Sequence, residues 1–559
     1  MRATLLLFVA IFAALGGCGG SGSDAPSCSD GLENGAETGV DCGGGCGPCP
    51  AGSGCGLPGD CASRVCTGSI CAAPTCGDGV MNGDESSDDC GGSTCPGCPP
   101  GLMCRTDADC ATGWCNPAAP PVKSCDCGEP DAIYVSAAGQ DANRGSRSQP
   151  LRTPQAAVAC AIQRPRPIRV AEGLYPSDLA TIGRVSLADG LSLLGGYSPD
   201  FTARDPAVHV STIRDVTDLS TNPYGWTAAV HVGSTSPDTV LEGFTIEGVT
   251  TGAVSEALTI SSPGSATIRG NVIQCGGSPS ATNARCIDVT TTGATPVIMG
   301  NTIHVGVAQS TAWGVYGLTT IPPEVASNAI DGGAAPTVVG IDLGNVAQAG
   351  GAIRANLIQL GAGAGTSYGV VVDGSAPVLV EANELRLSAS AAVGLRVHAG
   401  ASMLRNNLLV MSGAGTAIED GSGSEISNNT IVGTSGTGVL AKVSGSAIRN
   451  NAFDQAGGIC IAEEGLTAAP FSIRNNDLFG CAILYRDEGT GYLVALGDVN
   501  GLPGAAANLV QDPQFDATTY HPGASSPLLG AGADLSTLFV TDKSGAARTV
   551  PWTIGAYEQ

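Results

Sequence analysis

Short stretches of alternating apolar residues recur between residues 286 and 420, and their third position holds a carboxylate, an arginine or a tyrosine in most of them. Examples are Cys286-Ile-Asp288-Val and Gly340-Ile-Asp342-Leu. Alternate side chains of a strand point to opposite faces, so the third residue of each stretch is expected on the outside. Asp288 and Asp342 would stand two strands apart, about 9 to 10 Å, near the upper limit for a carboxylate pair that hydrolyses a glycosidic bond with inversion. The whole outward column contains Asp288, Tyr316, Asp342, Val371, Arg396 and Glu419.

Aromatic residues beside this column offer flat faces to sugar rings. Trp313 and Tyr368 come just ahead of the same stretches, and Tyr316 belongs to the column. One interpretation is a glycan site, with Ca²⁺ as a ligand of the carboxylates. The simpler interpretation is a solvated face, on which Arg396 and Glu419 form an exposed ion pair that contributes little. The candidate catalytic residues are Asp288, Asp342, Arg396 and Glu419.

A recurring six-residue phrase positions these stretches. It reads aliphatic, any two residues, Asn, any residue, aliphatic or Phe, as in Ile268-Arg-Gly-Asn-Val-Ile273. Nine such asparagines follow at intervals of 30, 27, 28, 27, 24, 22, 22 and 25 residues, a period that indicates a solenoid. The flanking Ile, Val, Thr and Gly favour strands, and each Asn is expected in a tight turn where it stacks into a ladder. The ladder consists of Asn271, Asn301, Asn328, Asn356, Asn383, Asn407, Asn429, Asn451 and Asn476.

Five of the nine positions two residues before these asparagines hold an arginine. Such a stripe can bind an acidic polymer, but a solvated face is the simpler interpretation. The five histidines of the chain are scattered, and we interpret them as incidental. The arginines are Arg269, Arg354, Arg405, Arg449 and Arg474.

The repeat resembles the right-handed parallel β-helix of the pectate-lyase-like superfamily over about residues 130 to 559. The stretch that begins Ala132-Ile-Tyr-Val-Ser and the ending Ile554-Gly-Ala-Tyr-Glu are similar to the opening and closing segments of a subgroup of bacterial surface proteins of unknown function. The resemblance implies an all-β solenoid of about ten or more coils, whose substrate groove lies on the strand that carries the outward column. The carboxylate motifs of polygalacturonases are missing, and so is the clustered Asp, Lys and Arg set of the lyases.

The N-terminus has the pattern of an exported lipoprotein. A short apolar run ends in Leu15-Gly-Gly-Cys18, which resembles a bacterial lipobox. The expectation is a signal peptide over residues 1–17, lipid on Cys18, a flexible tether over residues 18–27, and attachment to the outer membrane or cell surface of a Gram-negative bacterium. An ordinary signal peptide with a coincidental Cys is the alternative. The net charge of −25 argues against a nucleic-acid partner.

Two tandem cysteine-rich modules follow, over residues 28–75 and 76–127. Each contains eight cysteines and little apolar material, so we expect four disulfides in each, with a connectivity that spacing does not reveal. Zinc is the weaker alternative, because no His lies in this region. The recurring Asp, Asn and Glu residues are interpreted as turn formers and less readily as Ca²⁺ ligands, since the EF-hand order is missing.

Six further cysteines lie beyond the modules, an even number that suits an oxidising location. Cys275 with Cys286 would close a short loop, Cys460 with Cys481 lie about one coil apart, and the remaining two would form the third pair. A cap residue and Pro at residues 153–154 begin a short helix, expected to cover the first coil. The β-helix is predicted over residues 128–511 and its closing segment over 512–559. The third pair is Cys127 with Cys160.

The sequence favours a surface display or recognition module without catalytic activity, with a glycan or another cell-envelope component as ligand. A divergent polysaccharide lyase or glycoside hydrolase is the alternative, and a structural spacer is the third hypothesis. Convergent acids and aromatics in a groove would indicate an enzyme, aromatics alone a binder, and a flat wall a spacer. No cofactor or structural metal is expected, and the oligomeric state stays open.

Overall fold

The computed structural model describes residues 27–559 except 117–122, 163–164, 179–182, 218–225, 249–253, 277–280, 362–364, 466–468 and 488–490. The predictions for the signal peptide, for Cys18 and for most of the tether lie outside these residues. The chain forms two compact units, one ending at Cys125 and one beginning at Asp126. The second unit thus begins two residues before the predicted boundary and includes Cys127, which is bonded to Cys160 in the capping helix.

Each cysteine-rich module is held together by four disulfides with the same connectivity. The first cysteine bonds to the third, the second to the fourth, the fifth to the seventh and the sixth to the eighth. Cysteines make up the buried clusters of both modules, so disulfides take the place of an apolar core. The bonded pairs are Cys28–Cys46, Cys42–Cys49, Cys55–Cys66, Cys61–Cys71, Cys76–Cys95, Cys90–Cys98, Cys104–Cys115 and Cys110–Cys125.

Regular structure in the modules is limited to short pieces, and aspartates stabilise the turns between them. Both carboxylate oxygens of Asp41 accept from the Gly31 amide at 2.9 and 3.1 Å, and Asp89 holds Gly79 in the same way in the second module. These contacts match the interpretation of the acidic residues as turn formers. The elements are η1 (Pro58–Asp60), β1 (Cys66–Thr67), β2 (Ile70–Cys71), η2 (Asp107–Asp109), β3 (Cys115–Asn116) and β4 (Ser124–Cys125).

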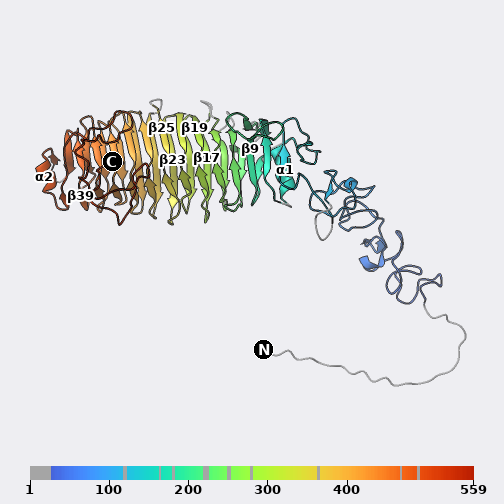
Figure 1. Ribbon diagram of the computed structural model, residues 1–559. Coiled ribbons are helices and arrows are strands. Elements are labelled where there is room, and N and C mark those ends of the chain that lie inside the picture. Colours follow the sequence, from blue (N-terminus) through green and yellow to red (C-terminus); the bar gives the residue numbers. More distant parts are fainter. Residues whose placement is uncertain are drawn as a thin grey trace, which may run out of the picture. The chain divides into compact units, whose positions relative to one another are not determined.

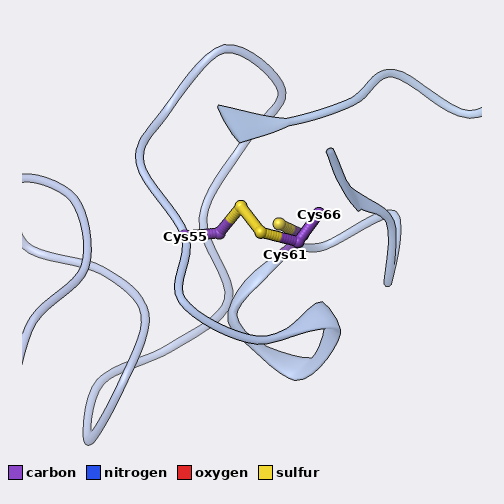
Figure 2. A group of neighbouring side chains, drawn as sticks. All are labelled: Cys55, Cys61 and Cys66. Carbon is purple, nitrogen blue, oxygen red and sulfur yellow. A yellow bond between two sulfur atoms is a disulfide. The ribbon is translucent and has the colours of Figure 1, made fainter. Parts of the chain in front are cut away.

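The sulfur atoms in these modules are engaged with one another. Figure 2 shows Cys55, Cys61 and Cys66, whose sulfurs lie close enough together to suggest a metal site. Cys55 is bonded to Cys66, however, and Cys61 to Cys71. A disulfide sulfur has no thiolate to offer a metal, so the geometry favours disulfides over the zinc alternative.

The second unit is a right-handed parallel β-helix, as predicted, built from three long parallel sheets (Figure 1). One coil runs through β17 (Asn283–Thr291), β18 (Val297–Met299), the turn at Asn301 and β19 (Thr302–Val307), and β20 (Thr311–Thr319) begins the next. Each strand pairs in parallel with the equivalent strand of the coils before and after it. Ile287, Ile298 and Ile303, one from each strand of this coil, are fully buried in the shared core.

We name the three sheets by their place in the coil. The long-strand sheet contains β8 (Val185–Leu187), β11 (Trp226–Val232), β14 (Val254–Ser261), β17, β20, β23 (Thr337–Val346), β26 (Thr366–Gly374), β29 (Ala391–Ala399), β32 (Thr416–Asp420), β35 (Thr437–Ala441), β38 (Ile459–Glu463), β41 (Ile483–Asp487) and β42 (Gly491–Leu493). The pre-Asn sheet contains β5 (Ile133–Val135), β6 (Ile168–Ala171), β9 (Ser192–Tyr197), β12 (Val240–Glu242), β15 (Thr267–Arg269), β18, β21 (Glu324–Ala326), β24 (Ala352–Arg354), β27 (Leu379–Glu381), β30 (Met403–Arg405), β33 (Glu425–Ser427), β36 (Ala447–Arg449), β39 (Ser472–Arg474) and β43 (Ala505–Ala506). The post-Asn sheet contains β7 (Gly173–Ser177), β10 (Ser211–Asp215), β13 (Phe244–Glu247), β16 (Val272–Gln274), β19, β22 (Ala329–Ala334), β25 (Leu357–Leu360), β28 (Glu384–Leu387), β31 (Leu408–Met411), β34 (Thr430–Val432), β37 (Ala452–Asp454) and β40 (Asp477–Phe479).

The asparagine ladder is continuous from Asn271 to Asn476. The side-chain oxygen of each Asn accepts from the backbone amide and the side-chain amide of the Asn one coil earlier, as Asn301 does from Asn271 at 3.1 and 3.0 Å. The side-chain amide also donates to a carbonyl of an earlier coil, as Asn301 does to Ile268. The ladder extends one position further than predicted, because Asn476 donates to Asn508.

Two short helices lie at opposite ends of the solenoid (Figure 1). Helix α1 (Pro154–Ala161) begins after Thr153, whose side chain accepts from the Ala156 amide, and it packs against β5, β6 and β8 over the first coil. Helix α2 (Leu496–Asn500) packs against β41, β42 and β43 at the last coils. Among the described residues, neither helix has the length and apolar character needed to span a bilayer.

The closing segment, residues 512–559, runs back along the solenoid towards earlier coils (Figure 1). Four asparagines that directly precede ladder asparagines bind its backbone. Asn475 donates to the Ala531 carbonyl, Asn450 to Ala533, Asn428 to Thr553 and Gly555, and Asn406 to Thr541, all at 2.8 to 3.1 Å. Earlier coils have Gly, Ser or Ala at this place, so the Asn-Asn pairs mark the coils to which the segment is bound through asparagine side chains.

Candidate functional site

The register of the long-strand sheet aligns the predicted outward column. Asp288 is the register partner of Tyr316, and Tyr316 is that of Asp342. The same register continues through Val371 and Arg396 to Glu419. The six residues of the predicted column are therefore register partners on successive coils. Asp288 and Asp342 lie two coils apart, with Tyr316 between them.

The interpretation of this column as a solvated face is wrong at three positions, because Val371 is buried as well as two carboxylates. Asp288 and Glu419 are only 5% and 7% exposed. Arginine side chains cover both carboxylates, one from the same strand as Asp288 and one from the coil before Glu419, an effect that alternation does not reveal. Arg285 covers Asp288, and Glu419 accepts from Arg396 at 3.1 Å. The expected Arg396–Glu419 ion pair is thus present, but its carboxylate is buried.

A second column runs beside the first and begins with two residues that the sequence analysis missed. Glu256 pairs in register with Arg285, Arg285 with Trp313, and Trp313 stands two coils from Tyr368. Glu256 belongs to the coil of Asn271, one coil before the first stretch of the predicted column, so that column did not extend to it. Counting back from Arg285 by one coil would have found it.

Glu256 and Asp288 form a buried acid pair on adjacent coils. Their carboxyl groups lie within hydrogen-bonding reach of each other, and Glu256 is 4% exposed. The Arg285 guanidinium bridges them, 2.7 Å from Asp288 Oδ2 and 3.5 Å from Glu256 Oε1. Burial, and then the charge of Asp288, raise the pKa of Glu256 to about 7. Burial and the neighbouring carboxylate thus favour the protonated form of Glu256.

The acid pair lines a pocket of about 390 Å³ on the outward face. Thr259 donates its hydroxyl to Glu256, and Thr290 donates to Asp288, both at 3.0 Å. The same region contains buried arginine nitrogens. Arg285 Nε and two nitrogens of Arg184 have no hydrogen-bond partner among the described residues. Burial lowers the pKa of Arg184, which the charge of Glu256 partly offsets. The pocket thus combines hydrogen-bond donors and acceptors.

Aromatic rings continue this surface from the pocket. Trp313 and Tyr316 meet edge to face with centroids 5.2 Å apart, and the Arg285 guanidinium lies 4.1 Å from the Tyr316 centroid. Trp313 donates its indole N–H to Asp342 at 2.9 Å, and burial raises the pKa of that carboxyl. Tyr368 contacts Arg396 at 5.4 Å. The ligand-binding candidates therefore lie on one face, each tied to a charged neighbour.

Glu419 is the centre of a separate basic network at the far end of the column. It contacts Lys442 at 3.0 Å and His398 at 3.3 Å in addition to Arg396. Burial acts to raise the pKa of Glu419, but these cations outweigh it and the pKa lies below its usual value. A carboxylate held ionised in this way has the character of a structural ion pair and is a poor proton donor.

Glutamates neutralise most of the arginine stripe on the pre-Asn sheet. Four of the five arginines bind a glutamate of the preceding coil, which supports a solvated ion-pair ladder over a polymer-binding stripe. Arg474 has no carboxylate partner among the described residues. The pairs are Arg269–Glu242, Arg354–Glu324, Arg405–Glu381 and Arg449–Glu425.

The raised pKa of Glu256 predicts a specific dependence of stability on pH. The folded chain holds this proton more tightly than the unfolded chain, whose Glu has a pKa of 4.5. The stabilisation is fully present below about pH 4.5 and is lost as the pH rises to about 7. The free energy of unfolding of the native protein should fall by roughly 2 kcal/mol more than that of Glu256→Gln across this window. Urea titrations of the native protein and of Glu256→Gln at pH 4.5 and 7.5 measure these free energies. An equal change with pH in the two proteins would contradict the raised pKa of Glu256.

The fold and site define a class, the right-handed parallel β-helix proteins. Residues 339–499 match the family described as right-handed β-helix region, and residues 137–366 match a protein family of unknown function, DUF1565. No curated protein matches the chain. Among solved structures, the crystal structure of pectate lyase Pel9A is similar with a TM-score of 0.31 and 12% identity, covering 78% of this chain and 97% of that one.

Proposed function

We propose that the outward face of the long-strand sheet binds a glycan and that the protein is a recognition module displayed at the cell surface. One observation carries the proposal, the pocket of Glu256 and Asp288 beside the ring pair of Trp313 and Tyr316. Sugars present hydroxyls to polar groups and flat C–H faces to aromatic rings. A face that combines both over neighbouring coils fits a chain of sugar units.

The spacing of the carboxylates supports binding more than hydrolysis. Glycosidases separate their two carboxyl groups by about 5 to 9.5 Å to admit a sugar carbon or a water. Glu256 and Asp288 instead lie within hydrogen-bonding reach of each other. Asp288 and Asp342 have the wider separation, but Tyr316 stands between them in the column.

Location at the cell surface is part of the proposal. The described residues contain 22 cysteines, all joined in eleven disulfides, which supports export to an oxidising compartment. The remaining cysteine, Cys18, ends the lipobox-like stretch. Lipid on Cys18 would anchor the protein in the outer membrane of a Gram-negative cell.

A hydrolase is the second candidate function, and the acid pair favours it. A carboxyl group with a pKa near 7 is protonated often enough at neutral pH to act as a general acid. Glu256 has this property, and unlike Asp477, whose pKa burial also raises to about 7, it lies on a face where acids and aromatic residues converge. In that case Glu256 would protonate the leaving oxygen of a bound glycan.

The test is binding and product release by the purified full-length protein. A panel of neutral and acidic polysaccharides, with and without Ca²⁺, is titrated by calorimetry, and reducing-end and unsaturated products are assayed in parallel. We expect at least one glycan to bind without product release, and Trp313→Ala to weaken that binding tenfold or more through the lost stacking area. Products that disappear in Glu256→Gln would favour the hydrolase.

The matched control is Tyr492→Ala, which removes an exposed aromatic from the last strand of the same sheet, eight strands from β20. It should leave glycan binding unchanged. Tyr368→Ala tests the face independently, should Trp313→Ala disturb the fold. Absence of binding across the panel would leave the spacer hypothesis in place of recognition.

A further inference from the structure

An open groove lies on the other side of the last coils, away from the long-strand sheet. The pre-Asn strands β36 and β39 form one wall, and the closing segment forms the other. The groove has a volume of about 720 Å³. Its lining includes Arg449, Phe471, Arg474, Pro503, Asp534 and Leu535.

Two arginines of the stripe lie on adjacent coils in this groove, and only one of them has a glutamate partner. Arg449 and Arg474 are register partners on adjacent strands, about 4.8 Å apart along the solenoid. Arg449 binds Glu425 with its Nε 3.0 Å from Oε1. The position of Glu425 is taken by Ala447 in the next coil, so Arg474 lacks the corresponding partner. Arg474 donates its Nε to the Gly504 carbonyl at 3.2 Å, and it forms no ion pair with any described residue.

An arginine without a carboxylate partner stands out in a chain of net charge −25. Four other arginines of the stripe are neutralised by the preceding coil, and Arg474 alone is left to an external anion. A guanidinium binds a carboxylate through two parallel N–H donors, and one unpaired guanidinium matches one negative charge. The charge pattern therefore selects a ligand with a single carboxylate over a dianionic phosphate.

The other residues that line the groove indicate the rest of the ligand, beyond its carboxylate. Phe471 is 77% exposed beside Arg474, and Pro503 and Leu535 add apolar surface. Asp534 contributes a carboxylate from the closing segment, one oxygen of which accepts from the Ser536 amide at 2.9 Å. A second carboxylate repels a purely anionic ligand but accepts hydrogen bonds from hydroxyls. An aromatic face, apolar edges and a hydroxyl acceptor together match a sugar ring.

We propose that this C-terminal groove is a second binding site that takes an acidic sugar. The sugar carboxylate pairs with Arg474, its ring stacks on Phe471 and a hydroxyl donates to Asp534. The site is separate from the glycan face of the long-strand sheet and does not depend on it. The two would hold different parts of a polysaccharide, or different polysaccharides.

The experiment compares three small probes on the full-length protein by NMR titration. D-glucuronate carries both the ring and the carboxylate, D-glucose the ring alone, and acetate the carboxylate alone. Binding of D-glucuronate should be at least tenfold tighter than binding of D-glucose or of acetate. Arg474→Gln should weaken D-glucuronate binding tenfold or more, and Phe471→Ser should weaken it severalfold.

The matched control is Arg269→Gln, because Arg269 occupies the same stripe and is paired with Glu242 at 2.7 Å. It should bind D-glucuronate like the native protein. Equal affinities for acetate and D-glucuronate, or an unchanged affinity in Arg474→Gln, would overturn the proposal. Since Arg474 and Phe471 are exposed, both variants are expected to fold.

Discussion

Replacing Asn429 by Ala is expected to lower the free energy of unfolding by roughly 4 kcal/mol. The Asn429 side chain is fully buried in the middle of the ladder. Its oxygen accepts from the backbone amide and the side-chain amide of Asn407, both at 3.0 Å, and its amide donates to the Leu404 carbonyl at 2.8 Å and to Asn451 at 3.0 Å. Alanine leaves these groups buried without that partner, and each such group costs about 1 to 3 kcal/mol.

Urea denaturation followed by circular dichroism measures this loss. Asn283→Ala is the matched control, because the Asn283 side chain makes no hydrogen bond with a described residue, and it should change stability by less than about 0.5 kcal/mol. A ladder variant as stable as this control would show that the ladder bonds merely replace equivalent bonds to water.

Replacing Arg548 by Met is expected to release the closing segment from the solenoid. The Arg548 side chain is completely shielded from solvent, and it donates to Asn406 at 2.7 Å and to the Gly555 and Ala556 carbonyls. It also pairs with buried Glu558 at 3.2 Å. Burial lowers the pKa of Arg548 to about 10. Removing one partner of a buried pair leaves the other charge uncompensated, which costs about 3 to 5 kcal/mol.

Hydrogen exchange of the closing segment is the direct measurement. Amides that this segment buries against the solenoid, such as those of Gly555 and Ala556, should exchange at least a hundredfold faster in Arg548→Met than in the native protein. Amides of the central coils should keep their protection. Exposed Arg152, changed to Met, is the control and should leave both regions unaffected. Unchanged protection of the closing segment would assign its attachment to other contacts.

The solenoid was predictable because its signal is local and repeated. Every ladder Asn lies between aliphatic neighbours, and the same spacing recurs in coil after coil, so the fold, the capping helix and the outward column followed from pattern alone. The three cysteine pairs of the solenoid could be matched because few cysteines were available. Eight cysteines in a module allow 105 connectivities, and spacing does not choose among them.

The site was less predictable because its properties arise between coils. Glu256 lies in the coil of Asn271, one coil before the first residue of the predicted column, so the pattern found Asp288 but not its partner. Burial of Asp288 depends on the reach of Arg285, which alternation does not describe. One wall of the groove at Arg474 comes from the closing segment, which lies about 60 residues further along the chain.

The four asparagines that hold the closing segment also fix the number of coils beneath it. They are spaced one coil apart, and each binds a different part of the segment, at residues 531, 533, 553 and 555, and 541. A duplicated or deleted coil between Asn406 and Asn475 would shift part of this set out of register, whereas no described residue before Glu384 pairs with the segment. Evolution can therefore lengthen or shorten this protein by whole coils in its first part, while the last part keeps a fixed length.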